Sequence, residues 1–117
     1  MQISKRSIND TLEKQVRGMW YQLIADTKTS GEAQLVFDEL LTETETTAIS
    51  KRVAVAYWLS KKRSYENIKQ NLKVSSATIA SVQQGMDRAG WKLALRRVMA
   101  DEWATKWNGK IKDWLKR

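Results

Sequence analysis

Apolar residues recur at helical spacing along this 117-residue chain, and no residue type forces its helices to break. The chain has no proline and only five glycines, so helices must end at caps, glycines or polar turns. The first apolar stripe predicts a helix from about Ser7 to Thr27 and consists of Ile8, Leu12, Val16, Met19, Trp20, Leu23 and Ile24. This periodicity predicts an all-α fold, with the stripe in a core or a dimer interface.

Two further helices are expected before residue 62. Ser30 is the expected cap of a helix that runs through Leu40 or Leu41. The segment 42–45 then has a hydroxyl followed three residues later by a carboxylate, the capping-box pattern, and opens a helix from about Glu43 to Lys61. The expected inner face of that helix consists of Ile49, Val53, Ala56, Tyr57 and Leu59 or Ser60.

The rest of the chain predicts two short helices and one long one, about six helices in total. Ser64 is placed to cap a helix over residues 65–72, and Ser75 or Ser76 to cap another from Ala77 to about Gly85. The final helix is expected from about Arg88 to Trp114, with a break at 108–109. We therefore expect a domain over residues 1–87 and a C-terminal helical extension over 88–117.

Composition excludes most kinds of active site. The chain contains no cysteine and no histidine, which removes disulfides, thiol chemistry, Cys- or His-based zinc sites and histidine bases. The acidic residues lie at expected caps or exposed faces, and the adjacent pair Asp38 and Glu39 points to opposite sides of its helix. We expect neither an enzyme nor a metal site. With no transmembrane-length apolar run and no signal-peptide pattern at the first residues, we expect a cytoplasmic protein.

The net charge of +8 is unevenly distributed along the chain. Residues 1–50 carry net −3, residues 51–90 net +6 and residues 91–117 net +5. A basic segment behind an acidic one indicates a polyanionic partner, either nucleic acid or an anionic membrane surface, or else a solvated basic face.

The short helices at residues 64–84 have the pattern of a helix-turn-helix motif. Two such helices can cross over a tight turn only if a few positions are apolar or small. The residues that fit this small motif core are Ile68, Leu72, Val74, Ile79 and Val82. A plain helical hairpin with one polar face is the alternative.

The side chains between those apolar positions are small, hydroxylated or cationic, as a helix entering the major groove requires. The expected base contacts are Ser75, Ser76, Ala77, Thr78 and Ser81. The expected phosphate contacts are Lys61, Lys62, Arg63, Lys69 and Lys73. The pattern predicts sequence-specific binding of double-stranded DNA, with the helix from about Ser76 as the reading element of a transcriptional repressor.

Three segments in this order resemble the Trp-repressor superfamily, and most of all the short Trp-repressor-like proteins of YerC/YecD type. The segments are Phe37-Asp38-Glu39-Leu40-Leu41-Thr42, Ser50-Lys51-Arg52-Val53, and residues 68–79 with Ala77-Thr78-Ile79 at the start of the second motif helix. The resemblance covers about Glu32 to Gln84. It implies an intertwined all-helical homodimer whose two motifs face successive major grooves.

The resemblance also bears on ligand binding. In tryptophan-sensing members two arginines sandwich the co-repressor, and Arg52 matches the first of them. The second position holds Ser81, followed by Val82 in place of a small glycine. Because serine cannot stack or pair as a guanidinium does, we expect no L-tryptophan co-repressor. We expect no other cofactor either. Arg52 and Thr42 remain candidates for a residual ligand site.

The extension over 88–117 is basic and rich in tryptophan, with Trp103, Trp107 and Trp114 on one helical face. Three interpretations stay open: docking on the domain or a partner subunit, extra contact with DNA phosphates, and binding to a membrane surface. Asp101, Glu102 and Asp113 weaken the membrane interpretation. The alternative function for the whole chain is a helical adaptor whose Trp-rich tail binds a protein partner or an anionic membrane.

Overall fold

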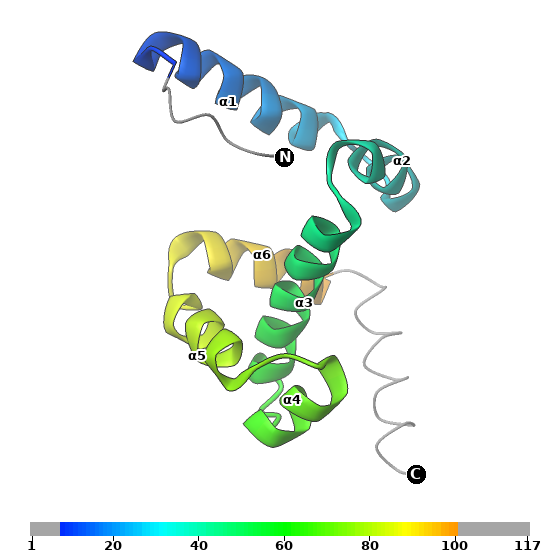
Figure 1. Ribbon diagram of the computed structural model, residues 1–117, viewed down its shortest axis with the longest axis vertical. Helices are drawn as coiled ribbons and strands as arrows, with labels where there is room; N and C mark the ends of the chain where they lie inside the picture. Colours follow the sequence, from blue (N-terminus) through cyan, green and yellow to red (C-terminus); the bar gives the residue numbers. More distant parts are fainter. Residues whose placement is uncertain (1–7, 101–117) are drawn as a thin grey trace. The chain divides into compact units, whose positions relative to one another are not determined.

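The computed structural model describes residues 8–100, which form six α-helices and no strands (Figure 1). This confirms the all-α prediction for that part of the chain. The helices are α1 (Asp10–Asp26), α2 (Ser30–Leu40), α3 (Glu43–Ser60), α4 (Tyr65–Leu72), α5 (Ser76–Gly85) and α6 (Ala89–Ala100).

The first helix begins later than the sequence predicted, and the second begins at a cap other than the expected one. Asn9 caps α1, and its side-chain oxygen accepts the backbone N–H of Leu12 at 2.8 Å, so the helix starts later than Ser7. Thr29, one residue before the expected Ser30, caps α2 and accepts the N–H of Glu32 at 3.1 Å. Neighbouring Ser, Thr and Asn residues all have the chemistry of a cap, so the sequence alone does not decide between them.

The packing divides the chain into two compact units, residues 1–43 and 44–117. In the first unit, Trp20 of α1 and Phe37 of α2 meet edge to face with ring centroids 5.6 Å apart. Arg17 and Glu13, one turn apart on α1, form an ion pair at 3.0 Å, and this hydrogen bond raises the pKa of Arg17. No side chain of α1 or α2 is buried. The described part of this unit therefore has no core of its own.

The second unit has its core around the end of α3. The buried residues are Val55, Ala56, Tyr57, Trp58, Ile68, Ile79 and Val82. Four consecutive residues of α3 are in this set, so the end of the helix is covered on all sides rather than along one stripe. The expected inner face was therefore only partly right. It omitted Val55 and Trp58, and it included Ile49, which is exposed.

α3 ends in a Schellman motif. The N–H of Arg63 donates to the carbonyl of Trp58 at 3.1 Å, and that of Lys62 to Leu59 at 3.0 Å. Lys62 has the left-handed conformation that this motif requires, with φ of 66°. The nearby Lys61 ammonium lies 5.5 Å from the centre of the Tyr57 ring.

α6 packs on the same core through Trp91, Leu95 and Val98. The expected final helix therefore exists as far as Ala100, beginning at Ala89. The expected remainder to Trp114, with Trp103 and Trp107, lies outside the described residues, and the domain boundary at residue 87 stays a prediction. None of the described helices combines the length and apolar character needed to cross a membrane.

Candidate nucleic-acid interface

α4 and α5 pack against each other as the two helices of a compact motif on the end of α3 (Figure 1). Ile68 of α4 and Ile79 of α5 are completely buried, and Val82 nearly so. Leu72 and the turn residue Val74 are half-buried against the same cluster. The Tyr65 hydroxyl also donates to Gln83 Oε1, which joins the start of α4 to the end of α5. The five apolar residues expected to form the motif core are thus brought together.

The turn between α4 and α5 is made by a lysine in a conformation that usually takes glycine. Lys73 follows the last residue of α4 with φ of 54° and ψ of 53°. Its carbonyl accepts a hydrogen bond from Lys51 Nζ of α3 at 3.2 Å. A residue with a Cβ atom pays about 1–2 kcal/mol to adopt this conformation. The contact from α3 helps to hold the turn despite that cost.

Replacing Lys73 by glycine tests whether the left-handed conformation of this residue costs stability. We expect Lys73→Gly to raise the free energy of unfolding by about 0.5–1 kcal/mol, because glycine removes the Cβ strain but adds chain entropy to the unfolded state. Urea unfolding measures this gain. The same substitution at exposed Lys69, in the regular part of α4, is the matched control and should instead destabilise. A loss of stability in Lys73→Gly would contradict the strain argument.

α5 begins with a capped turn of hydroxyl side chains. Ser75 Oγ accepts the backbone N–H of Thr78 at 3.1 Å and lies 3.0 Å from the Thr78 hydroxyl. Ser76 and Ala77, in the first turn, are exposed, and so is Ser81. Of the expected base contacts, Ser75 is therefore engaged as the helix cap, whereas Ser76, Ala77 and Ser81 present open surface.

Removing the Ser75 hydroxyl should weaken the helix that it caps. We expect Ser75→Ala to lower the free energy of unfolding by about 1 kcal/mol, the usual cost of losing a serine cap. Thermal and urea unfolding measure the loss. Ser76→Ala, one residue on, is the control, because the described structure gives Ser76 no capping bond and alanine suits the first turn of a helix. Equal stability of wild type and Ser75→Ala would contradict the capping role.

The expected phosphate contacts lie at the two turns that flank α4 and on α4 itself. Lys61, Lys62 and Arg63 lie in the α3–α4 turn, Lys69 on α4 and Lys73 in the α4–α5 turn. All are exposed except Arg63, which is half-buried. Residues 51–90, which include the motif, carry net +6, so the surface around the motif is positively charged.

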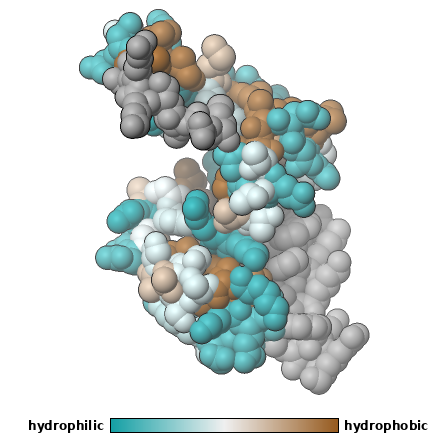
Figure 2. Space-filling model, viewed as in Figure 1, coloured by the Kyte–Doolittle hydropathy of each residue, from teal (hydrophilic) through white to brown (hydrophobic). Residues whose placement is uncertain are grey.

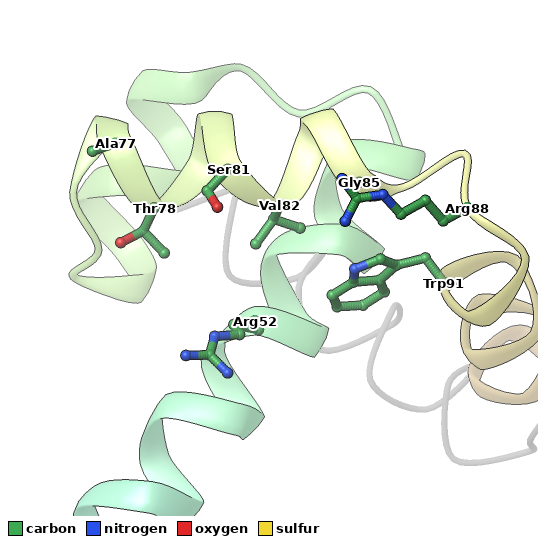
Figure 3. A pocket seen from close by; sticks show the side chains of 8 residues that line it. All are labelled: Arg52, Ala77, Thr78, Ser81, Val82, Gly85, Arg88 and Trp91. Carbon is green, nitrogen blue, oxygen red and sulfur yellow. The ribbon is translucent and has the colours of Figure 1, made fainter. Parts of the chain in front are cut away.

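A pocket of about 420 Å³ lies beside α5 (Figure 3). Thr78, Ser81 and Val82 project from α5 toward α3, where Arg52 is placed, and the Arg88 side chain reaches back from the α5–α6 turn toward Gly85. We call this cavity the α5 pocket, and its lining consists of Arg52, Ala77, Thr78, Ser81, Val82, Gly85, Arg88 and Trp91.

Sequence reasoning found only part of this pocket. From the sequence, Arg52, Ser81 and Val82 are indicated as positions of a ligand site and Ala77 and Thr78 as base contacts, whereas Arg88 and Trp91 fall in the expected extension. A methyl group added at Gly85 would meet both, at 3.5 Å from Arg88 Nη1 and from Trp91 Cδ1. Thr42, the other candidate for a ligand site, lies at the end of the first unit. That Thr42 and Arg52 belong to one ligand site stays a prediction. In the described part of the chain, no three acidic side chains are grouped as a metal site.

Comparison with known proteins gives one result. A family model described as Trp repressor protein matches residues 17–97, which is more than half of the chain. The match begins within α1 and ends within α6, so it extends beyond the resemblance at residues 32–84 that the sequence motifs indicated. No curated protein and no solved structure matches the chain.

Proposed function

The chain belongs to the Trp repressor protein family, whose members are DNA-binding helix-turn-helix regulators rather than enzymes, and we propose that it is a sequence-specific repressor that reads the major groove with α5. The observation that carries the proposal is the packing of α4 and α5. Ile68, Ile79 and Val82 turn inward, and in the first turn of α5 Ser76 and Ala77 stay exposed while Thr78 is half-buried. A helix N-terminus with small side chains approaches base edges and phosphates closely.

The basic residues around the motif support contact with the DNA backbone. Lysines at the ends of α4 and on its exposed face stand next to the reading helix, where phosphates on either side of a groove would lie. Each neutralised phosphate releases counterions, so the logarithm of the binding constant should fall with the logarithm of salt concentration.

Two substitutions test the assignment of roles. We expect Lys69→Ala to weaken binding to all duplexes alike and to reduce the salt slope by about 1, because it removes one phosphate contact. We expect Thr78→Ala to change the preferred base at one position of each half-site more than it changes overall affinity. Fluorescence anisotropy over a salt series, on the selected duplex and its single-base variants, measures both. Lys28→Ala, in the turn before α2, is the control and should behave as wild type. Reversed effects would refute the proposed reading face.

The exposed apolar surface of the first unit supports a homodimer (Figure 2). Met19 is 74% exposed and Leu35 is 75% exposed, although both are large and apolar. The stripe of α1 continues through Leu12, Val16 and Leu23, and the described part of this unit has no buried residue. A second copy of the chain is the partner we propose, because it would cover this surface and place two α5 helices on one duplex.

We further propose that DNA binding does not depend on L-tryptophan. Ser81 stands where the tryptophan-sensing pattern has its second arginine, and the Val82 side chain takes up space beside it, only 5% exposed. Titration calorimetry should show no binding at micromolar L-tryptophan. Saturable heat in that range would overturn this part of the proposal.

A further inference from the structure

A hydrogen bond from α3 reaches the turn that connects the two helices of the motif. Lys51 Nζ donates to the carbonyl oxygen of Lys73 at 3.2 Å, although the two residues are 22 apart in the sequence. Lys51 is half-buried and lies one helical turn before Val55, which is completely buried in the core. The bond therefore ties the turn to the helix that supplies most of the buried residues of this unit.

The turn is short, so its conformation decides the direction of α5. Only residues 73–75 separate α4 from α5. Lys73 has φ of 54° and ψ of 53°, and a right-handed conformation would require a change in φ of about 120°. A change of that size within three residues would swing α5 away from its packing against α4. A side chain that binds a partner must instead be held to within about 10–20° of its productive orientation.

The left-handed conformation is not the one that a lysine prefers. A residue with a Cβ atom is disfavoured in this region, whereas glycine enters it about as readily as the right-handed region. The ammonium of Lys51 opposes this preference, because a charged donor forms a stronger hydrogen bond than a neutral one. Val74 and the cap Ser75 follow directly, so the bond also fixes where the first turn of α5 begins.

We propose that Lys51 is a positioning residue for DNA reading, whose bond to the Lys73 carbonyl keeps the α4–α5 turn left-handed and thereby orients α5 in the major groove. Lys51 acts through the turn and not through a contact of its own with DNA phosphates. The effect on DNA rests on the proposed function, whereas the hold of Lys51 on the turn does not.

The hold on the turn is tested by urea unfolding of a double-mutant cycle at fixed protein concentration. Lys51→Met keeps a straight side chain but removes the donor. Lys73→Gly removes the conformational cost at the acceptor residue and leaves its carbonyl in place. We expect Lys51→Met to lower the urea midpoint at least about twice as much with lysine at position 73 as with glycine there. Equal losses in the two backgrounds would overturn the proposal.

The orientation of α5 is tested by the ratio of affinities for the selected duplex and for an unrelated duplex. We expect Lys51→Met to reduce this ratio at least about fivefold, as loss of a charged hydrogen bond allows. Lys51→Arg restores a charged donor and should recover the ratio, and both variants should keep the salt slope of wild type. Lys92→Met removes the same charge from an exposed position of α6 and should keep the wild-type ratio.

Two results with DNA would refute the positioning role. One is an unchanged affinity ratio in Lys51→Met. The other is equal weakening on every duplex with a salt slope reduced by about 1, which would make Lys51 a phosphate contact. If wild type binds no duplex at all, the proposed function and the reading role both fail, while the urea cycle still decides whether Lys51 holds the turn.

Discussion

A Val16→Glu/Met19→Glu double variant is expected to be monomeric and to lose duplex binding at least about a hundredfold. Both residues lie on the apolar stripe of α1, and both are at least half exposed in the single chain. If a second copy covers this stripe, the variant places two carboxylates in an apolar interface, at a cost of several kcal/mol each unless they are paired. A monomer also holds only one half-site, so it loses the gain in affinity from binding both.

Light scattering after gel filtration measures the mass of the variant, and anisotropy measures its DNA affinity. The matched control is Thr11→Glu/Gln22→Glu, which changes the charge equally on the same helix at positions outside the stripe. The control should remain a dimer. A dimeric Val16→Glu/Met19→Glu variant with wild-type affinity would contradict the assignment of this face to the dimer interface.

Ile79→Ala is expected to lower the free energy of unfolding by about 2–5 kcal/mol, the cost of removing most of a buried isoleucine side chain. Ile79 is completely buried and belongs to the core that α5 shares with α3 and α4. The loss should also reduce DNA affinity, because α5 is then less firmly held. Urea unfolding at a fixed protein concentration measures the change, since the stability of a dimer depends on concentration. Ala80→Ser, at the next and exposed position of α5, is the control. A loss below about 1 kcal/mol would contradict the central place of Ile79 in the motif.

The motif helices could be predicted closely because their signals are local. Ser64 caps α4 as expected, with its hydroxyl accepting the N–H of Asn67 at 3.1 Å, and α5 begins within one residue of the expected start. The spacing of Ile68, Ile79 and Val82 alone predicted which side chains turn inward. Cap chemistry and apolar periodicity act within a few residues, so a single sequence expresses them directly.

Features set by tertiary packing could not be predicted in this way. The end of α3 is surrounded by other helices, so four consecutive residues are buried and the helical stripe that sequence reasoning relies on disappears. A lysine takes the left-handed position at the α4–α5 turn, where a glycine would have been the usual signal. Arg88 and Trp91 join the α5 pocket because of the direction the chain takes between α5 and α6, and no local sequence pattern indicates that direction.

The most direct test of the central claim is selection of duplexes from a randomised DNA pool by the purified full-length protein, followed by titration of the selected duplexes against salt. We expect enrichment of a two-fold symmetric site with half-sites one helical turn apart, about 10–10.5 base pairs, and binding that weakens steeply as salt increases. Failure to enrich any sequence, with only weak salt-sensitive binding to all duplexes, would contradict a sequence-specific dimeric repressor that reads the major groove with α5.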